Sequence, residues 1–326
     1  MPIPPEIERL LKQREDLRKE KKYSEADEVR KQIESLGYVI KDSVEGTVVS
    51  KKETIPLNKE VRKLIGVFGS GELSPTGRRV HEYLISHLKA PVKIALIETP
   101  AGFEVNPLNW YQKLSDMMSI GLQNFQPQIS IIDALRKDGE KSTNNPTLLA
   151  PMLDADYIHA GAGSPSYAGT HLADSLAYQY MIDMFDRGSV LSFASAAAIA
   201  FSKYLLPVYE MYKVGEDLHW NKGTNFFAKW GLNLTIIPHW NNNEGGQGID
   251  TSRCFMGVER FKKLLQMLPE PTPILGIDEQ TACIFDLEKK EVKVMGNGTA
   301  TVMDSISMKA TLLRSPSSFS FEEFKL

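Results

Sequence analysis

From residue 63 onward, short apolar runs alternate with longer segments of helical periodicity, and most runs end in small or polar residues. Such runs are typical of strands that are buried on both faces of a mainly parallel sheet. The sequence therefore predicts an α/β fold, a three-layer α/β/α sandwich with helices on both sides of the sheet. The predicted strands are residues 64–68, 92–97, 129–132, 157–160, 189–193 and 234–237, and residues 282–286 and 291–295 predict a hairpin at the sheet edge.

The first 52 residues have a different pattern and predict a small helical hairpin. Apolar residues recur at helical spacing in residues 6–20, and Ser24 can cap a second helix that ends at Gly37. Residues 1–52 contain 12 Lys and Arg against 11 Asp and Glu, which indicates a mixed-charge surface and not a basic arm. We expect a hairpin at residues 1–52, a linker at 53–62 and one large domain at 63–326.

Composition narrows the classes of protein that the chain can represent. Apolar residues make up 42% and charged residues 24%, as in an ordinary soluble protein, and the net charge of −3 calls for neither nucleic acid nor an anionic membrane as partner. Only two cysteines are present, Cys254 and Cys283, which excludes a disulfide framework and favours a reducing cytoplasm. The N-terminal segment lacks the apolar core of a signal peptide. We therefore expect a cytoplasmic protein with no membrane partner, no structural metal and no cofactor.

Ser195 is the first candidate for chemistry, because ligands of open α/β sheets lie beyond the carboxyl ends of the strands. It follows a predicted strand within Phe193-Ala194-Ser195-Ala196-Ala197-Ala198 and precedes an Ala-rich helix. Small neighbours are what a strained strand-to-helix elbow needs around a nucleophilic serine. The alternative is that an Ala-rich helix here simply packs closely on its strand.

His239 and Glu210 are the candidate partners of this serine. His239 ends another predicted strand and precedes a polar, glycine-containing loop, where a general base is well placed. Glu210 could orient the imidazole and stabilise its charged form. The alternatives are a histidine that only caps its strand and a glutamate exposed to solvent. Other carboxylates could also take the role of the acid, namely Glu216, Asp217 and Glu244.

The turn Gly161-Ala162-Gly163 should lie beside the elbow, since it ends the strand expected next to that of Ser195. Backbone N–H groups of Gly163 and Ala196 could then form an oxyanion hole. As a nucleotide-binding loop the turn is weak, because it lacks the Lys-Ser/Thr pair. Arg253, Asn241 and Glu244 are candidates to bind substrate. Arg253 could hold a substrate carboxylate with two parallel hydrogen bonds, or it could form an ion pair within the chain.

The order glycine turn, Ser195, Glu210, His239, followed by Gly276-Ile277-Asp278-Glu279-Gln280-Thr281-Ala282, resembles the peptidase E and cyanophycinase family. The turn Val294-Met295-Gly296-Asn297-Gly298 is similar too, so that the resemblance covers roughly residues 63–302. It implies the serine-nucleophile branch of the class I glutamine amidotransferase-like fold, with small acidic or isoaspartyl peptides as substrates. Ala194 and Ala197 stand where the family has glycine, which puts the activity of the elbow in question.

The N-terminal hairpin resembles a different family. Ser24-Glu25-Ala26-Asp27-Glu28-Val29-Arg30, then Leu36-Gly37 and then Lys41-Asp42-Ser43-Val44-Glu45-Gly46-Thr47 are similar to the C-terminal end of cysteinyl-tRNA synthetases. That small helical piece lies near tRNA, but HIGH-type and KMSKS-type motifs are missing here, so aminoacylation is not implied. We favour a helical adaptor that packs on its own domain or on a partner over contact with tRNA.

Two functions of different classes follow from these patterns. The first is a serine peptidase or amidase that uses Ser195, His239 and Glu210 on a small peptide-like substrate. The second is a catalytically silent binding module of the same fold, whose hairpin docks to RNA or a protein. A glutamine amidotransferase is less favoured, because its nucleophile is a cysteine at the elbow, and neither cysteine lies there. A homodimer is left open, because the sequence does not determine the oligomeric state.

Overall fold

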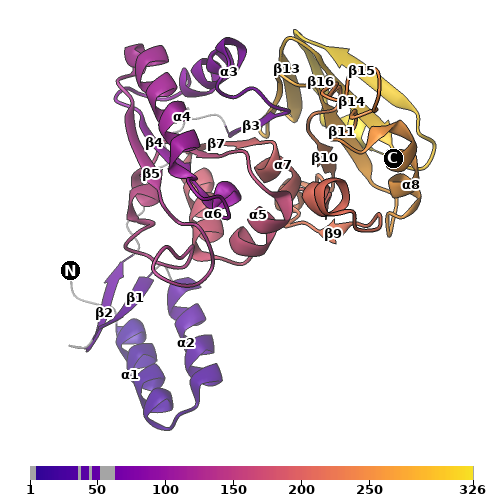
Figure 1. Cartoon of the computed structure of the whole chain (residues 1–326). Coiled ribbons are helices and arrows are strands. Elements are labelled where there is room, and N and C mark those ends of the chain that lie inside the picture. The colour runs from indigo at the N-terminus through magenta and orange to yellow at the C-terminus, as the bar shows by residue number, and fades with distance from the viewer. Residues whose placement is uncertain (1–4, 36–37, 44–45, 52–62, 326) are drawn as a thin grey trace. The chain divides into compact units, whose positions relative to one another are not determined.

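The computed structural model describes residues 5–35, 38–43, 46–51 and 63–325, and the chain divides into two compact units, Met1–Leu57 and Asn58–Leu326 (Figure 1). The predicted linker at residues 53–62 lies outside the described residues, as does Gly37, the predicted end of the second helix. Each unit is described separately below.

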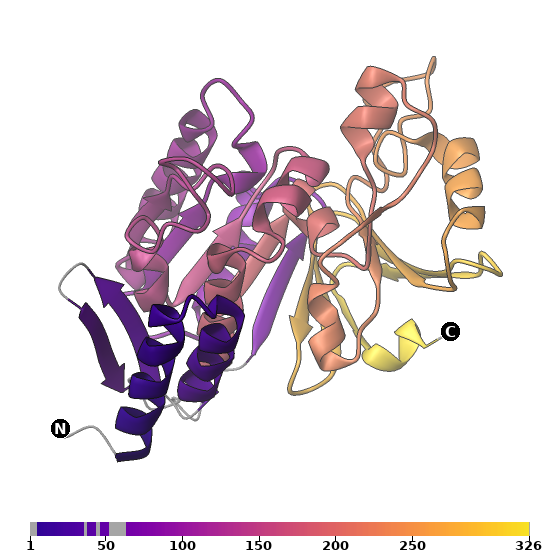
Figure 2. The same ribbon diagram turned by 90° about the horizontal axis from the view of Figure 1, so that it is seen from below.

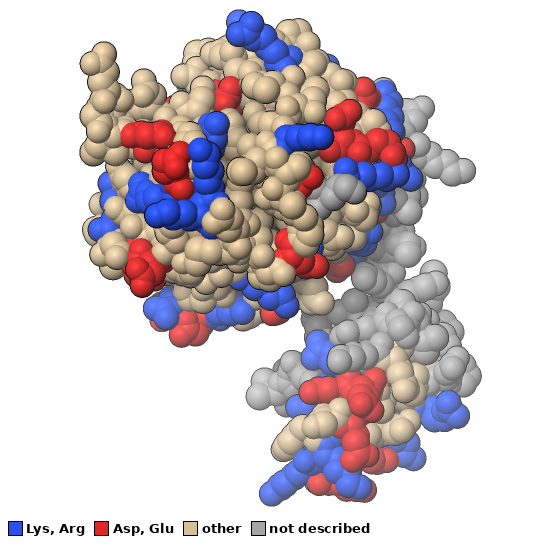
Figure 3. Space-filling model, turned by 90° about the vertical axis from the view of Figure 1, so that its right-hand side faces the viewer, with Lys and Arg blue, Asp and Glu red and all other residues tan. Residues whose placement is uncertain are grey.

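The N-terminal unit pairs two helices, α1 (Pro5–Lys19) and α2 (Tyr23–Ser35), as the sequence pattern predicts. Its core consists of Ile7, Leu10, Val29, Ile33 and Ile40. Strands β1 (Tyr38–Ser43) and β2 (Gly46–Lys51) then form an antiparallel hairpin. Acidic and basic side chains are interspersed on the face of this unit that Figure 3 shows, in keeping with its balanced charge.

The second unit is built on an eight-stranded sheet with the order β16-β13-β12-β3-β7-β6-β4-β5. Strands β3, β7, β6, β4 and β5 are parallel to one another, and β12, β13 and β16 extend the sheet antiparallel. The predicted mainly parallel sheet is thus confirmed. The bounds are β3 (Leu64–Phe68), β4 (Lys93–Ile97), β5 (Gln128–Ile132), β6 (Tyr157–Ala160), β7 (Val190–Ala194), β12 (Thr281–Asp286), β13 (Glu291–Gly296) and β16 (Ser317–Ser320).

Helices cover both faces of this sheet, which gives the three layers that the sequence predicts (Figure 1, Figure 2). Leu64 and Phe68 of β3 pack in a core with α3 (Pro75–Ile85) and α4 (Leu108–Gly121). Ile65 and Val67 of the same strand belong to the other core, with the helices α5 (Pro165–Leu172), α6 (Leu176–Arg187) and α7 (Ala196–Ala200). Alternation along one strand therefore supplies both hydrophobic layers.

A second, four-stranded sheet has the order β10-β11-β14-β15, and it corrects two expectations. The run at residues 234–237, predicted for the main sheet, forms β10 (Thr235–Ile237) in this second sheet. The predicted hairpin is present as β12 and β13, but β16 lies beyond it, so that it is not the edge. The other strands are β11 (Pro273–Ile277), β14 (Thr299–Asp304) and β15 (Ala310–Arg314), and the pair β8 (Tyr204–Leu205) and β9 (Asn221–Lys222) stands apart.

The remaining elements are helical, and none of the helices within the described ranges is long and apolar enough to cross a bilayer. They comprise α8 (Gly257–Gln266), the π-helical turn η4 (Glu210–Val214), and the 3-10 turns η1 (Thr99–Ala101), η2 (Gln123–Phe125), η3 (Ala150–Asp154), η5 (Phe226–Trp230) and η6 (Phe321–Phe324).

The two sheets meet at the carboxyl ends of their parallel strands. Strand β7 lies between β3 and β6 in the main sheet, and β10 runs parallel to β11 in the second sheet. The backbone N–H of His239, just after β10, donates to the carbonyl of Gly69, just after β3, at 3.2 Å. Through this contact, the segments that follow β10 and β11 lie next to the segment that follows β7.

Candidate active site

Ser195 occupies a strained turn between β7 and α7. Its φ of 48° and ψ of −108° are rarely adopted by a residue with a side chain, and such strain is typical of a nucleophile elbow. The neighbours Ala194, Ala196 and Ala197 are all buried, so the turn has no room for larger residues. The Ser195 N–H donates to the carbonyl of Phe68 at 3.2 Å, which fixes the turn to β3.

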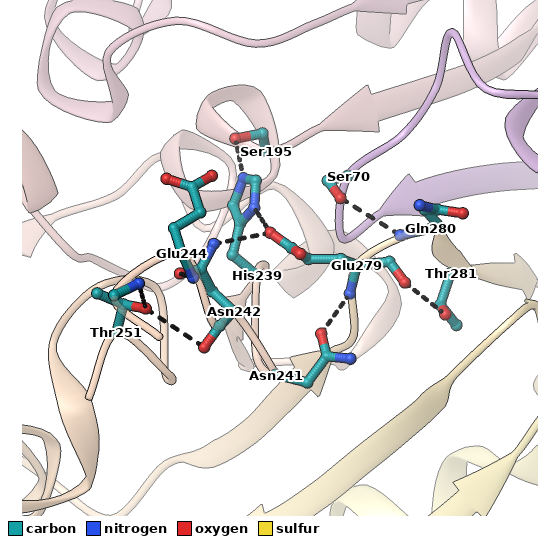
Figure 4. A network of polar contacts seen from close by, with 11 residues as sticks. Ser70, Ser195, His239, Asn241, Asn242, Glu244, Thr251, Glu279, Gln280 and Thr281 are labelled. Carbon is teal, nitrogen blue, oxygen red and sulfur yellow. Dashed lines mark hydrogen bonds and ion pairs between the residues drawn. The ribbon is translucent and has the colours of Figure 1, made fainter. Parts of the chain in front are cut away.

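His239 lies within hydrogen-bond reach of this serine. Its Nε2 is 2.9 Å from Ser195 Oγ, although the two residues follow strands of different sheets (Figure 4). The histidine follows the short strand β10 with a φ of 51°, and Figure 4 shows its ring directed at Ser195. The structure thus brings together the serine and the histidine that the sequence pairs, with the geometry of a nucleophile and its general base.

The carboxylate at the other imidazole nitrogen belongs to Glu279, and the prediction of Glu210 for this position is wrong. Glu279 Oε1 is 3.0 Å from His239 Nδ1. The reason lies in the second sheet: Ile237 of β10 is in register with Gly276 of β11, so that residues just past the two strands face each other. Glu210 instead lies on η4 and lines another cavity.

Two asparagines hold Glu279 in place. Asn242 donates through Nδ2 to the same Oε1 atom at 2.9 Å, and Asn241 Oδ1 accepts the backbone N–H of Glu279 at 2.8 Å. The hydrogen bond with His239, followed by that of Asn242, keeps the pKa of the Glu279 carboxyl below its ordinary value. Asn241, predicted to bind substrate, therefore supports the acid, and the carboxylate is held ionised against the imidazole.

Ser195 and His239 open into a cavity of about 330 Å³. Glu244, one of the predicted substrate-binding residues, lines this cavity, and Figure 4 shows its side chain beside His239. Cys254 lines it as well, but burial raises the pKa of its thiol, which opposes a thiolate nucleophile. The other lining residues are Ala162, Gly163, Pro165, Ile199, Val208, Tyr209, Tyr212, Lys213 and Phe255.

Gly163 lies on the wall of this cavity in a conformation that only glycine fits. Its φ is 145°, and a Cβ atom at this position would lie 1.9 Å from the carbonyl oxygen of Pro100. The turn ends β6, which is hydrogen-bonded to β7 as the sequence predicts. Ala196 begins α7 directly after Ser195. The two predicted contributors to an oxyanion hole thus flank the serine from neighbouring strands.

Arg253 has a different environment from the one predicted. Its Nη1 donates to the carbonyl of Trp240 at 2.9 Å, and its guanidinium carbon lies 4.0 Å from the centre of the Trp240 ring. It is not among the residues that line the cavity. The structure therefore uses Arg253 to brace the loop after His239, through a carbonyl and a ring and not through the alternative ion pair.

A second acid lies near the histidine but is enclosed by the protein. Glu72 is buried, its Oε1 has no hydrogen-bond partner, and burial raises the pKa of its carboxyl. Within residues 5–35, 38–43, 46–51 and 63–325, no group of three or more His, Cys, Asp and Glu side chains is arranged to hold a metal ion.

Comparison with known proteins gives different relatives for the two units. Residues 2–48 match the family described as the cysteinyl-tRNA ligase anticodon binding domain. Among curated proteins, cysteine–tRNA ligases of Methanosarcina mazei and Chlamydia abortus are 41% and 49% identical over 51 and 49 residues, which are 16% and 15% of this chain. The chain spans about a tenth of the length of these relatives, 11% and 10%.

Solved structures resemble most of the chain. A peptidase from an acI-B1 Actinobacterium superposes with a TM-score of 0.63 and 21% identity, over 80% of this chain and 98% of that one. A putative peptidase E protein from Listeria monocytogenes EGD-e covers 78% of this chain and 98% of its own, with a TM-score of 0.45 and 12% identity. The chain thus joins a unit similar to a tRNA-ligase anticodon-binding domain to an α/β unit with the fold of a solved peptidase.

Proposed function

We propose that the second unit is a serine peptidase or amidase whose catalytic residues are Ser195, His239 and Glu279. The observation that carries the proposal is the continuous chain of hydrogen bonds from Ser195 Oγ through both imidazole nitrogens to the carboxylate. A serine hydroxyl is a weak nucleophile until a base is placed beside it, and His239 Nε2 occupies that place. The strained backbone of Ser195 and the peptidase fold add support.

In this mechanism Ser195 Oγ attacks the amide carbonyl while His239 Nε2 takes its proton. The resulting imidazolium gives that proton to the leaving amine, and an acyl-enzyme remains on the serine. Water, deprotonated by the same nitrogen, then releases the acid product. Glu279 accepts the hydrogen bond from Nδ1–H throughout, which keeps the ring in the required tautomer and stabilises its positive charge.

The oxyanion that forms during attack would be held by the backbone N–H groups of Gly163 and Ala196. Donors fixed in advance stabilise the developing charge without reorganisation. The placement of Gly163 on the cavity wall and of Ala196 directly after the nucleophile supports this assignment.

A small peptide-like substrate fits the size of the cavity, about 330 Å³. An acidic or isoaspartyl residue beside the scissile amide is the substrate class that we propose. Lys213 is the basic residue on the lining of the cavity, and its ammonium group could attract a substrate carboxylate. Glu244 would then face the nitrogen side of the substrate.

A fluorophosphonate probe, followed by mapping of the modified residue, tests the proposal. We expect one adduct, on Ser195, because the probe reacts with a serine that a base has activated. The Ser195→Ala chain should give none, and His239→Ala should react far more slowly. Ser70→Ala is the matched control, since Ser70 lies near the site and its hydroxyl accepts a hydrogen bond from the backbone N–H of Gln280. A folded native chain without any adduct would favour the silent binding module.

The N-terminal unit supports a second, separate function, binding of tRNA. The match of residues 2–48 to an anticodon-binding domain favours this function, whereas the balanced charge of the unit argues for weak attraction to phosphates. We expect the chain lacking residues 1–57 to keep the labelling rate of Ser195 and to lose binding to unfractionated tRNA, measured by filter binding at about 0.1 M salt. Equal tRNA binding with and without these residues would contradict the role in tRNA binding.

A further inference from the structure

Three consecutive residues beside the active site, Arg253, Cys254 and Phe255, have a left-handed backbone. Their φ angles are 57°, 57° and 68°, and residues with side chains adopt this conformation singly and seldom in succession. We call residues 253–255 the left-handed turn. Backbone strain of this kind persists only where the surrounding structure enforces it, and it is concentrated at functional sites. The left-handed turn therefore points to a part that it positions.

Hydrogen bonds from two directions hold the left-handed turn in place. The backbone N–H of Cys254 donates to the carbonyl of His239 at 3.1 Å. From α8, Arg260 donates through Nη2 to the carbonyl of Phe255 at 2.8 Å. The turn is thus tied directly to the general base, and the position of the Phe255 side chain relative to the imidazole is fixed with it.

The ring of Phe255 is the part of the turn that faces the substrate. Its centre lies 5.8 Å from that of the His239 ring and 5.3 Å from that of the Tyr212 ring. Phe255 and Tyr212 both line the active-site cavity and are half-buried, so a ligand in the cavity can contact their rings. Aromatic rings attract one another at centre-to-centre distances of this range, and a ring of the substrate would gain the same contacts.

The wall around these two rings is largely apolar. Pro165, Ile199 and Val208 contribute apolar side chains to the same cavity, whose charged lining residues are Lys213 and Glu244. A ligand group that removes apolar surface from water gains affinity in proportion to the area it covers. The cavity therefore favours a large apolar group next to the aromatic pair.

The chemistry of the site assigns the aromatic pair to the amine side of the scissile bond. In the proposed mechanism His239 Nε2 gives its proton to the leaving nitrogen, so the residue that departs lies on the imidazole side of Ser195. Phe255 packs against that imidazole. Glu244, which we expect to face the nitrogen side of the substrate, lies beside His239 as well (Figure 4).

We propose that Phe255 and Tyr212 form a subsite for an aromatic side chain on the leaving amine, and that Phe255 determines this specificity. The substrate ring packs on these two rings and displaces water from the apolar wall. As a statement about substrate, the proposal rests on the hydrolase function proposed above. As a statement about binding, it requires no reaction at Ser195, so the two can fail separately.

Equilibrium binding of two amines tests the subsite without any chemistry at Ser195. Phenylalaninamide and alaninamide both resemble the leaving amine, and they differ only in the phenyl ring. We expect the native chain to bind phenylalaninamide about tenfold or more tightly, because its ring leaves water for an apolar wall. Isothermal titration calorimetry on the full chain measures both constants. In hydrolysis, kcat/KM should favour aspartyl-phenylalaninamide over aspartyl-alaninamide in the same direction.

Variants then assign the preference to its cause. Phe255→Leu keeps an apolar side chain and removes the ring, so the preference for phenylalaninamide should fall about 2- to 10-fold, the worth of an aromatic pair. Labelling of Ser195 by the fluorophosphonate probe should continue at the native rate, because leucine still packs on His239. Phe103→Leu is the matched control, an exposed ring that lines a separate cavity, and should keep the native preference.

Each outcome decides the proposal. Equal binding of the two amines by the native chain would overturn the subsite, whatever the variants do. A preference that survives Phe255→Leu unchanged would overturn the role of Phe255. So would a loss of Ser195 labelling in Phe255→Leu as large as that in His239→Ala, since Phe255 would then act by holding the base. If the native preference is present while Ser195 stays unmodified, the subsite stands and the hydrolase function fails.

Discussion

Replacement of Glu279 by glutamine is expected to lower turnover about 10³- to 10⁴-fold, the size of effect seen when the orienting acid of a serine-histidine-acid triad loses its charge. The carboxylate accepts from His239 Nδ1 at 3.0 Å, and the amide that replaces it can present an N–H to the same nitrogen. The imidazole would then carry its proton on Nε2, which could no longer accept the proton of Ser195. Both the tautomer and the stabilisation of the imidazolium are lost.

The measurement is the rate of fluorophosphonate labelling, together with kcat on a small peptide amide once one is identified. Glu216→Gln is the control, since Glu216 was an alternative for the acid and is exposed. The pKa of Glu279 is lowered, so its charge stabilises the folded chain at a pH above the ordinary value of 4.5, and this contribution is lost as the pH falls through the folded value.

An unchanged labelling rate in a folded Glu279→Gln chain would remove Glu279 from the mechanism. Asn242→Ala offers a graded comparison, because it removes one hydrogen bond to the carboxylate and leaves the charge. We expect a smaller loss, about tenfold, as for one neutral donor to a charged group. A loss as large as that of Glu279→Gln would indicate that Asn242 supports the whole loop.

Ser195 and His239 could be predicted from the sequence because each lies within two residues of the end of an apolar run that becomes a strand. Nucleophile and base are found at the carboxyl ends of strands, and linear order is enough to locate such ends. Glu279 could not be assigned in the same way. The motif at residues 276–282 contains Glu279, but the approach of this side chain to His239 depends on the parallel pairing of β10 with β11, which no local pattern specifies.

Local sequence patterns locate strands, but they do not assign each strand to a sheet. The predicted strands 64–68 and 157–160 are present with those bounds, because buried parallel strands are continuous apolar runs. Such a run does not indicate which sheet the strand joins. The prediction that residues 234–237 belong to the main sheet is therefore wrong, because β10 lies in the four-stranded sheet. Arg253 shows the limit for single side chains. Its guanidinium group has the geometry to bind a substrate carboxylate, but in the structure it contacts the carbonyl and the indole ring of Trp240.

A second large effect is expected on stability in acid, from two buried histidines, His81 on α3 and His159 on β6. His81 and His159 are fully buried and belong to one polar network. His81 Nδ1 is 2.6 Å from the hydroxyl of Tyr157, which is 2.6 Å from Ser192 Oγ, which is 2.6 Å from His159 Nδ1. Burial lowers the pKa of His81 to about 3 and that of His159 well below its ordinary value. Both rings are therefore held neutral in the folded chain.

The sign of the effect follows from proton uptake. Below the ordinary pKa of 6.5 the unfolded chain binds protons at these histidines and the folded chain does not, so the free energy of unfolding falls as the pH falls. Two pH units below 6.5, His81 alone accounts for about 3 kcal/mol. Urea unfolding of the native chain at about pH 7.5 and pH 4.5 should show this loss of stability, and the loss should be smaller in His81→Gln.

The network also connects acid stability to the active site. A Cβ atom on Gly161 would lie 3.3 Å from His159 Nε2, and the Gly161 N–H donates to the hydroxyl of Tyr111 at 3.3 Å. Protonation of His159 would place a charge directly under the turn that carries Gly163. We therefore expect fluorophosphonate labelling of Ser195 to be lost together with the folded signal as the pH falls. His219→Gln is the matched control, since that ring is partly exposed and should leave the pH dependence of unfolding as in the native chain. An equal pH dependence in the native chain and in His81→Gln would show that His81 is not held neutral by the fold.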